Sequence, residues 1–562
     1  MRWRAVPVKL EDRNSPMTET NFSPDVAPDS YDVMPYPATA QTESHPDRLA
    51  TLATLMGLNP PPVNHCRVLE LGCSDGGNLL SLAYGLPDSQ FVGVDSSARE
   101  VAAGQSQIAE LGLRNIALHH LDITQVGSTL GSFDYILACG VYSWVPPQVQ
   151  EQMLDLCRQL LAPQGVAYIN YNTYPGWFMR GAIREMLLYH TRAIADLRER
   201  AVAARAMLGF VADAAQATQE KSGSHGTSRS AYVAILRHEQ AVLDQHPDTY
   251  LLHEHLEEHN EALYFHEFVE RAGRHGLQYL AEAEYPTSQL AHLPPDISQM
   301  VQQLGGDPVQ REQYLDFISN RSFRQTLLCR QGLSLRRAFG PEQLAGLWVA
   351  SPILPEADRP DMHSTAPETF RNARGSKLTA SHPVAKAALM HLSEIWPQAM
   401  AFDALLETAR RRLEPGALPM YSPERLAHEA KGVGEMLLHG FGADMVELHV
   451  HPPQFQTQVS ERPAVSLLAR HQARTGRQVI NLRHESVTID DEVTYRLLPS
   501  VDGEHDRAAL LNHLIGLVRD GRLVAQAENG RPYQDSANLE ALLKTAVDQA
   551  LRRLANAALL VA

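Results

Sequence analysis

The sequence predicts a multidomain protein that begins with an α/β domain and ends with an α+β region, with a mostly helical segment between them. Between residues 67 and 172, short apolar runs alternate with amphipathic stretches, which is typical of βαβ units and a parallel sheet. Residues 178–350 have mostly helical periodicity, whereas residues 378–562 mix helical stretches with short apolar runs. At 562 residues the chain is too long for one compact domain.

In the first region, each apolar run has the length of a strand and each amphipathic stretch the length of a helix. The predicted strands are residues 67–71, 91–95, 116–122, 135–139 and 166–172. The predicted helices are residues 78–86, 98–113 and 147–162. Because strands and helices alternate, we expect the carboxyl ends of the strands to lie along one edge of the sheet, where such folds bind ligands.

Composition divides the rest of the chain. Residues 1–30 are polar and proline-rich and are expected to be a disordered leader, so the first domain is expected to span residues 31–177. A helical connector with a Gly/Ser-rich break is expected over 178–230, and a linker over 351–377. The helical domain, 231–350, is predicted to include helices at 266–277, 312–320 and 323–331, and the C-terminal domain, 378–562, strands at 445–450, 478–482 and 493–498.

Charge and composition exclude several classes of function. The net charge of −16 argues against a nucleic-acid partner, because binding to phosphates requires concentrated Lys and Arg. We find no run of about 18 apolar residues, so no membrane span is expected. Five cysteines are too few and too scattered for a disulfide framework or a zinc set. These observations predict a soluble, cytoplasmic protein without a metal site.

The most informative segment is a strand that carries an acidic residue and leads into a loop of small residues and a helix. Small residues allow the backbone to approach a ligand closely, and the N-terminus of the following helix offers free N–H groups. A single loop of this kind is weak evidence, so its context must support it. The segment contains Glu70, Gly72, Cys73, Ser74, Gly76 and Asn78.

Acidic residues also follow the next two predicted strands. Asp95 lies 23 residues after Gly72, the spacing at which a carboxylate binds the ribose hydroxyls of a nucleotide. Asp122, before Ile123, could accept a hydrogen bond from an adenine amine. The loop lacks the G-x-G-x-x-G pattern of nicotinamide-dependent enzymes. The sequence therefore predicts a nucleoside-binding edge of a different kind.

The form Glu70-x-Gly72-x-x-x-Gly76 resembles the first motif of class I S-adenosylmethionine (SAM)-dependent methyltransferases, and Asp95 matches their second. Ser74 stands where many members have a second glycine. The resemblance implies a Rossmann-like methyltransferase sheet with SAM as cofactor. The residues that it and the strand-end pattern assign to SAM are Glu70, Gly72, Cys73, Ser74, Gly76, Asn78, Asp95, Ser96, Asp122, Ile123 and Cys139.

Further motifs extend the resemblance along the chain, among them Tyr31-Asp-x-x-Pro35-Tyr36, His45-Pro46-x-Arg48-Leu49, Gly140-Val-Tyr142-Ser-Trp144 and Asn170-Tyr-Asn172-Thr-Tyr174-Pro-Gly176-Trp177. They resemble one bacterial family, which joins a class I methyltransferase domain to a helical methyltransferase regulatory domain and a C-terminal winged-helix-like domain. That family includes rickettsial lysine methyltransferases that modify an outer-membrane protein. The resemblance implies methylation of lysine in a protein substrate, including an exported or outer-membrane protein as the substrate class.

Methyl transfer needs a nucleophile aligned with the methyl group, and it does not require a catalytic triad. Aromatic side chains can guide a lysine ammonium by cation–π contact. Four residues in the loops after the fourth and fifth strands are therefore candidates for the acceptor-site wall: Tyr142, Trp144, Asn172 and Tyr174. The alternative for each is that it only packs the helices after residue 177 onto the sheet.

Two other functions remain open from the sequence. The chain could be a SAM-binding adaptor without turnover, or a methyltransferase with a small-molecule acceptor. The glycines and acidic residues of the loop would be the same in all three cases. The oligomeric state is not indicated.

Two further patterns favour structural interpretations. Residues 253–259 contain H-x-x-E-H, a zinc-peptidase signature, but the chain has 25 histidines, so a chance match is the better interpretation. The segment 382–450 could be a winged helix with a recognition helix at 423–441. That helix carries three Glu against one Arg and one Lys, which favours docking to protein over binding to DNA.

Overall fold

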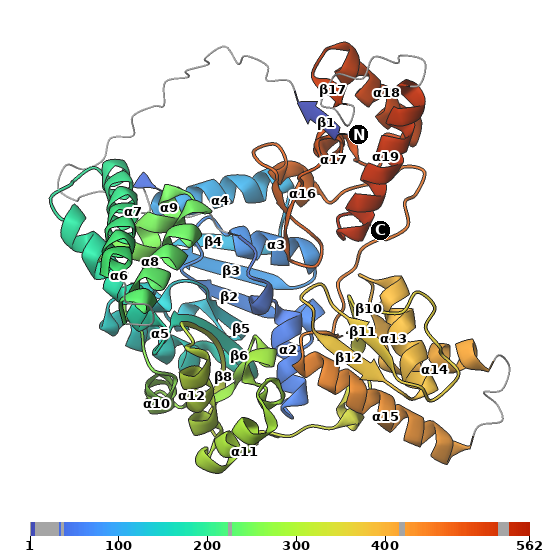
Figure 1. Cartoon of the computed structure of the whole chain (residues 1–562), viewed down its shortest axis with the longest axis horizontal. Helices are drawn as coiled ribbons and strands as arrows, with labels where there is room; N and C mark the ends of the chain where they lie inside the picture. The colour runs from blue at the N-terminus through green and yellow to red at the C-terminus, as the bar shows by residue number, and fades with distance from the viewer. Residues whose placement is uncertain are drawn as a thin grey trace.

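The computed structural model describes residues 2–5, 33–34, 39–222, 228–414, 422–526 and 539–561 (Figure 1). Of the expected leader, it describes only Arg2–Ala5, strand β1, which pairs with β17 (Leu523–Gln526) near the other end of the chain. The rest of the leader, and Tyr31, Pro35 and Tyr36, lie outside the described residues.

A seven-stranded mixed sheet organises the first half of the chain, in the order β4-β3-β2-β5-β6-β8-β7. The five parallel strands are those predicted: β2 (Arg67–Leu71), β3 (Gln90–Asp95), β4 (Ile116–His120), β5 (Phe133–Ala138) and β6 (Leu161–Asn172). Two strands from much later in the sequence complete the sheet: β7 (Leu277–Glu282) and β8 (Phe323–Arg330), with β8 antiparallel to β6. The sheet therefore extends well beyond residue 177.

The prediction of a helix at 323–331 is wrong, because this segment is β8. Its centre, Leu327 to Cys329, is fully buried between two neighbouring strands. A strand buried on both faces has a continuous apolar run instead of alternation, and periodicity cannot distinguish such a run from a helix.

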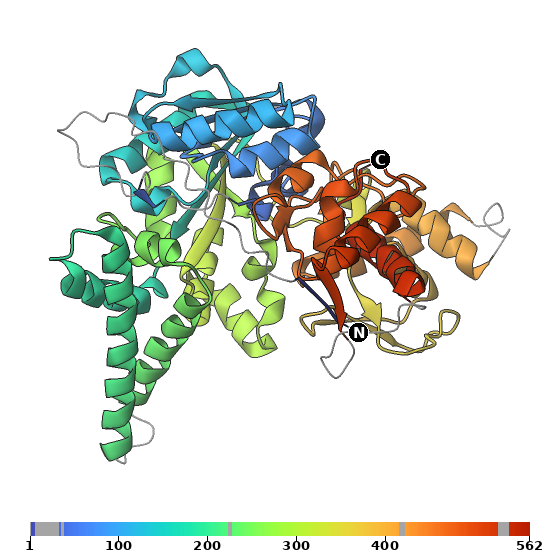
Figure 2. The ribbon, with the colours of Figure 1, turned by 90° about the horizontal axis from the view of Figure 1, so that it is seen from above.

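Helices cover both faces of the sheet (Figure 2). One face is covered by α2 (Pro46–Leu55), α3 (Gly77–Gly85) and α4 (Ala98–Leu111), whose apolar residues pack with Val68 and Phe91. The other face is covered by α5 (Pro147–Leu160) and α10 (Phe265–Arg274), which pack with Leu69 and Ile136. Val68 and Leu69 face opposite layers because side chains alternate along a strand.

The helices after β6 form a separate arm with its own apolar core (Figure 2). The arm consists of α6 (Trp177–Thr191), α7 (Leu197–Ser222), α8 (Ser228–Asp244), α9 (Asp248–Leu251) and the π-helical turn η6 (Leu252–Leu256). Beyond it, α10 is followed by α11 (Pro295–Leu304) and α12 (Pro308–Ser319). These helices alternate with β7 and β8, so the helical region and the sheet share one continuous structure.

Arg324, on β8, joins α12 to the sheet. Its guanidinium is fully buried and contacts Glu282 of β7 at 2.7 Å, Asp316 of α12 at 2.8 Å and Glu312 of α12 at 3.1 Å. It also lies 3.8 Å from the centre of the Phe265 ring, on α10. A buried cation is stable only when its charge is paired, and three carboxylates surround this one.

The second half of the chain begins with two three-stranded sheets and a group of helices. The sheets are β13-β9-β14 (Met400–Ala401, Trp348–Ala350, Glu447–His449) and β10-β11-β12 (Leu354–Pro355, Glu368–Arg371, Lys377–Ala380). The helices α13 (Pro383–Ile395), α14 (Phe402–Leu413) and α15 (Pro423–Gly442) pack beside them. The segment 351–377, expected as a linker, thus contributes strands to a sheet.

The last part of the chain has its own core, formed by α16 (Leu467–Gln472), the hairpin β15 (Gln478–Ile480) and β16 (Ser486–Thr488), α17 (Glu492–Leu497), α18 (Arg507–Arg519) and α19 (Leu539–Asn556). The predicted strand at 493–498 is wrong, because this segment is α17. Asp491 caps it by accepting a hydrogen bond from the Thr494 N–H at 2.8 Å, and Val493 and Leu497 share its buried face. No helix among the described residues is long and apolar enough to span a bilayer.

A buried histidine links α2 to β14. His449 Nδ1 lies 2.7 Å from Asp47 Oδ2, and its Nε2 lies 3.4 Å from Glu447 Oε2. Burial disfavours the charged imidazole, but the two carboxylates outweigh it and raise the pKa of His449 from 6.5 to about 9. A raised pKa in the folded state means that this contact stabilises the fold fully below pH 6.5 and is lost as the pH rises through 9.

We therefore expect His449→Gln to destabilise the protein at about pH 6 and to have a much smaller effect at about pH 9.5. The measurement is the thermal unfolding temperature of both proteins across this range. His65→Gln, at an exposed position, is the control and should unfold like the wild type throughout. An equal destabilisation at both pH values would contradict the charged role of His449.

Candidate functional site

The loop between β2 and α3 has a backbone that few side chains tolerate. Gly72 and Gly76 have φ angles of +71° and +77°, and Ser74 has a φ of +51°. A Cβ atom at Gly72 would lie 3.0 Å from Val141 Cγ2, and one at Gly76 would lie 2.8 Å from Leu118 Cδ1. The loop therefore requires glycine at both positions, for conformation and for space.

Asp95, at the end of β3, holds this loop in place. Its Oδ2 accepts a hydrogen bond from the Ser74 N–H at 2.8 Å, and its Oδ1 accepts one from the Ser97 N–H at 2.9 Å. The Ser74 hydroxyl in turn donates to Glu100 at 3.1 Å. Serine at the position where many class I methyltransferases have glycine thus gains a partner on α4.

Glu70 is buried beneath the loop. Burial raises the pKa of this carboxyl from 4.5 to about 7, against the stabilising hydrogen bond from Asn78 Nδ2 to Glu70 Oε1 at 3.0 Å. The other oxygen, Oε2, accepts no hydrogen bond from the described residues. A buried carboxylate oxygen without a donor needs one from a ligand, and Glu70 lines the cavity described next.

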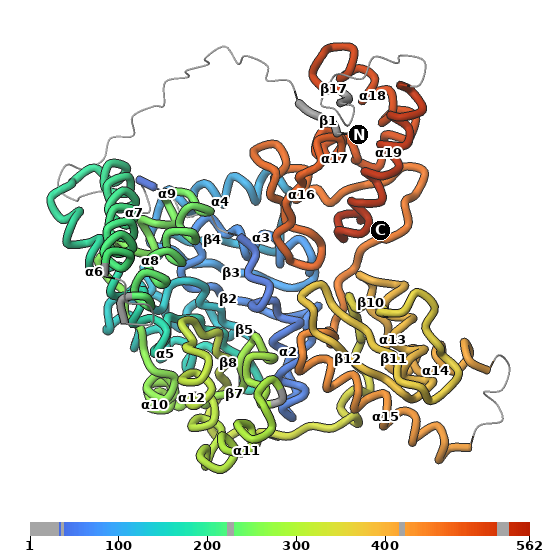
Figure 3. Tube along the Cα trace, viewed as in Figure 1, coloured from blue at the N-terminus to red at the C-terminus, as the bar shows by residue number. Residues whose placement is uncertain are grey.

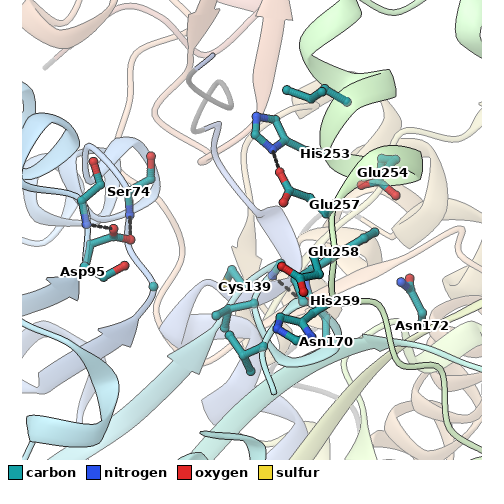
Figure 4. A pocket seen from close by; sticks show the side chains of 18 of the residues that line it. Ser74, Asp95, Cys139, Asn170, Asn172, His253, Glu254, Glu257, Glu258 and His259 are labelled. Carbon is teal, nitrogen blue, oxygen red and sulfur yellow. Dashed lines mark hydrogen bonds and ion pairs between the residues drawn. The ribbon is translucent and has the colours of Figure 1, made fainter. Parts of the chain in front are cut away.

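A cavity of about 1190 Å³ lies between the carboxyl edge of the sheet and the helical arm (Figure 4). This volume exceeds the roughly 300–1,000 Å³ of a pocket for one small ligand, so two reactants fit. The predicted cofactor residues that line it are Glu70, Gly72, Cys73, Ser74, Asn78, Asp95, Ser96, Asp122, Ile123 and Cys139. Gly76 does not line the cavity, and its role is to allow the backbone conformation of the loop.

The four predicted acceptor residues separate into two pairs. Trp144 and Asn172 line the cavity, and Asn172 Nδ2 is buried without a hydrogen-bond partner among the described residues. Tyr142 is fully buried in the core, with its ring edge-on to Phe268 at 5.4 Å, and does not line the cavity. Tyr174 lies outside it as well, stacked on Phe178 at 4.0 Å. Only the first pair is placed to contact a bound acceptor.

Neither Tyr142 nor Tyr174 lines the cavity, and for Tyr142 the reason is local. The chain turns sharply after β5, in a single 3₁₀ turn from Tyr142 to Trp144, so the two aromatic side chains at its ends point to different layers. Tyr142 turns inward toward α10, and Trp144 turns toward the cavity, edge-on to Trp177 at 6.3 Å. Sequence spacing alone does not give the direction of side chains in such a turn.

The helical arm supplies a wall that the sequence analysis did not assign to the site. It brings Arg180 of α6, Tyr250 of α9, and His253 and Glu254 of η6 to the cavity, followed by Glu257, Glu258 and His259. Glu254 lies 3.9 Å from Arg180, and burial raises the pKa of the Glu254 carboxyl. The H-x-x-E-H pattern at 255–259 marks this segment in the sequence, but the pattern is typical of zinc peptidases and not of an acceptor site.

The histidines of this pattern have partners other than a metal. His255 is fully buried with Nε2 2.9 Å from Glu239 Oε1, and His253 bridges Glu257 and the Met34 carbonyl at 2.7 and 2.6 Å. The π-helical turn ends at Leu256, so His255 and His259 do not share a helix face. Within the described parts of the chain, no group of His, Cys, Asp or Glu could hold a metal ion.

The cavity is acidic. Two guanidiniums line it, those of Arg180 and Arg200, against seven carboxylates: Glu70, Asp95, Glu100, Asp122, Glu254, Glu257 and Glu258. In Figure 4, Ser74 and Asp95 lie on one side, and His253, Glu254, Glu257 and Glu258 lie on the opposite side. A cavity of this charge favours cationic ligands.

Comparison with known proteins identifies the parts of the chain. Residues 69–167 match a methyltransferase domain, 247–330 a predicted methyltransferase regulatory domain, and 461–559 the PKMT C-terminal winged helix domain. The uncharacterized Rickettsia prowazekii protein RP789 is 33% identical over 94% of this chain and 93% of its own length.

Two solved structures of PKMT2 from Rickettsia typhi, one in complex with AdoHcy, cover 94% of this chain and 100% of their own. Their identities are 28% and 29%, and their TM-scores 0.80 and 0.81. The chain belongs to this family of SAM-dependent methyltransferases, with a regulatory domain and a C-terminal winged-helix domain. The family match begins at residue 461, so the helix predicted for recognition, α15, lies outside the matched winged helix.

The cofactor is SAM, and the residues present fit it. Gly72 presents only backbone to the cavity, Glu70 Oε2 is buried without a hydrogen bond from the described residues and could accept one from an ammonium, and Asp95 ends the second strand of the nucleoside edge. That these particular residues hold SAM stays a prediction.

Asp95→Ala should weaken SAM binding by roughly thirty- to a hundredfold, because it removes a partly buried, charge-assisted partner for the ribose and the anchor of the Ser74 N–H. Calorimetric titration with SAM measures the dissociation constant. Asp88→Ala, at an exposed turn outside the cavity, is the matched control and should bind like the wild type. Unchanged affinity in Asp95→Ala would remove Asp95 from the site.

Proposed function

We propose that this methyltransferase transfers the methyl group of SAM to the side-chain amine of lysine residues in a protein substrate. The observation that carries the proposal is an acidic wall formed by Glu254, Glu257 and Glu258 (Figure 4). This wall lies opposite the loop between β2 and α3, which is called the cofactor loop below. Carboxylates in a partly buried cavity attract an ammonium group strongly. The similarity to PKMT2 over the whole chain supports the same class of acceptor.

SAM supplies a methyl group that its sulfonium already activates, so the residues of this chain have only to bind, orient and deprotonate the acceptor. A lysine ammonium, with a pKa of about 10.4, must lose a proton before it can attack. Glu254 is suited to accept that proton, because burial raises the pKa of its carboxyl above the ordinary value. Arg180, 3.9 Å away, fixes its position.

Trp144 and Asn172 complete the proposed acceptor site from the sheet side. The Trp144 ring offers a π-face to the approaching ammonium. The unpartnered amide of Asn172 can hydrogen-bond the amine or the substrate backbone. Trp144 lies in the turn after β5 and Asn172 is the last residue of β6, at the same sheet edge as Asp95.

The acceptor class can be tested with SAM labelled in its methyl group and a lysate of the source cells. We expect label in acid-precipitable protein and, after hydrolysis, in methylated lysine. Label in arginine or in a carboxyl ester would replace lysine by another acceptor. Label that stays soluble in acid would indicate a small-molecule substrate, and no label above a control without enzyme would indicate an adaptor.

Glu254→Gln should lower kcat/KM for the protein substrate by roughly a hundredfold, because the amide cannot take the proton and attracts the ammonium less. SAM affinity should stay close to that of the wild type, since Glu254 lies across the cavity from the cofactor loop. Initial rates and calorimetric titration measure the two quantities.

The matched control is Glu185→Gln, which removes an exposed carboxylate of α6 that does not line the cavity. It should keep wild-type values for both. An undiminished rate in Glu254→Gln would show that this carboxyl neither receives the proton nor binds the acceptor.

A further inference from the structure

A loop of the C-terminal domain reaches the underside of the cofactor loop. It is the tight turn between β15 and β16 (Figure 3). This turn packs against α3, which lies about four hundred residues earlier in the chain. His484, at its tip, is buried. Its Nε2 lies 2.9 Å from Asn78 Oδ1, and its Nδ1 lies 2.9 Å from Ser81 Oγ.

The hydrogen bonds of Asn78 fix the orientation of its amide. Asn78 Oδ1 accepts from the Gln41 N–H at 2.9 Å, so this atom is the oxygen, and His484 Nε2 must be the donor to it. The opposite end, Nδ2, therefore faces Glu70 and donates to Glu70 Oε1 at 3.0 Å. His484 thus acts on Glu70 through a single intervening side chain.

His484 is held in this place at a conformational cost. Its φ is +60°, in the left-handed region that residues with a side chain rarely adopt. Asn481 maintains the turn by accepting hydrogen bonds from the N–H groups of Arg483 and Glu485, both at 2.9 Å. Thr42 adds a hydrogen bond to the His484 carbonyl at 3.0 Å. Strained residues that the surrounding structure fixes tend to occur at functional sites.

We propose that His484 is a positioning residue of the cofactor site: the winged-helix domain uses it to lock Asn78, and through Asn78 it orients the Glu70 carboxylate toward SAM. Docking of the C-terminal domain and binding of SAM are then coupled. Coupling between two binding events is reciprocal, so SAM must also tighten the contact between the winged-helix domain and α3.

The first test measures affinity for AdoHcy, the non-reactive probe, by calorimetry with the full-length chain. His484→Ala should raise the dissociation constant about tenfold, because Asn78 loses a donor and Glu70 its fixed partner. His484→Gln keeps an N–H near the position of Nε2 and should restore most of the affinity. In turnover assays, His484→Ala should raise KM for SAM while kcat at saturating SAM stays within about twofold of the wild type.

The matched control is Tyr84→Phe. The Tyr84 hydroxyl, also on α3, accepts a hydrogen bond from the Leu467 N–H at 3.0 Å across the same domain interface, without contact to Asn78. It should leave the AdoHcy affinity unchanged. Wild-type affinity in His484→Ala, or equal weakening by Tyr84→Phe, would overturn the proposal.

A second measurement needs no variant and applies even if His484→Ala does not fold. Hydrogen exchange of the wild-type protein is followed with and without saturating AdoHcy. We expect the peptide that contains residues 478–488 to exchange more slowly with AdoHcy, together with the loop at 72–78. Slower exchange in the loop alone would overturn the coupling.

Discussion

The buried guanidinium of Arg324 is the interaction on which the attachment of the helical region to the central sheet depends. It lies where β8 returns to the sheet, and it neutralises carboxylates from β7 and α12 in a place that water does not reach. Removing it would leave Glu282 buried without its counter-charge and Asp316 with Arg321 alone. Ser322 and Phe323, directly before it, line the cavity, so the same contact fixes the sheet side of the acceptor site.

The cavity follows from this arrangement. The sheet edge alone provides Glu70, Asp95 and the glycine loop, as such edges do in many folds with unrelated functions. The acceptor side is formed by the arm, which leaves the sheet at Trp177 and returns to the cavity at η6. In the function proposed above, the sheet edge holds the cofactor and the arm faces it with carboxylates.

The strand, loop and helix of the predicted cofactor edge occur where the sequence predicted them, because strand, loop, helix and strand-end acid follow one another within 30 residues and local pattern determines them. The sequence failed where the answer depends on distant residues and where a local cap or turn outweighs the hydrophobic pattern. The apolar run of β8 is a strand only because β6 and β7 flank it, and α17 is a helix because Asp491 caps it. The side chains of Tyr142 and Trp144 point in different directions because of the geometry of the single turn that contains them. Glu254 joins the site only through the packing of the arm, and His484 reaches it across the whole chain, so neither carried a local signal.

The split sheet has a consequence for the order in which the protein becomes active during synthesis. Domains fold as their residues leave the ribosome, from the N-terminus onward. Here the core sheet lacks two strands until residue 330 has emerged, and the underside of the cofactor loop stays unsupported until the turn at 481–485 arrives. By the coupling proposed for His484, a chain that lacks this turn would bind SAM less tightly than the full chain.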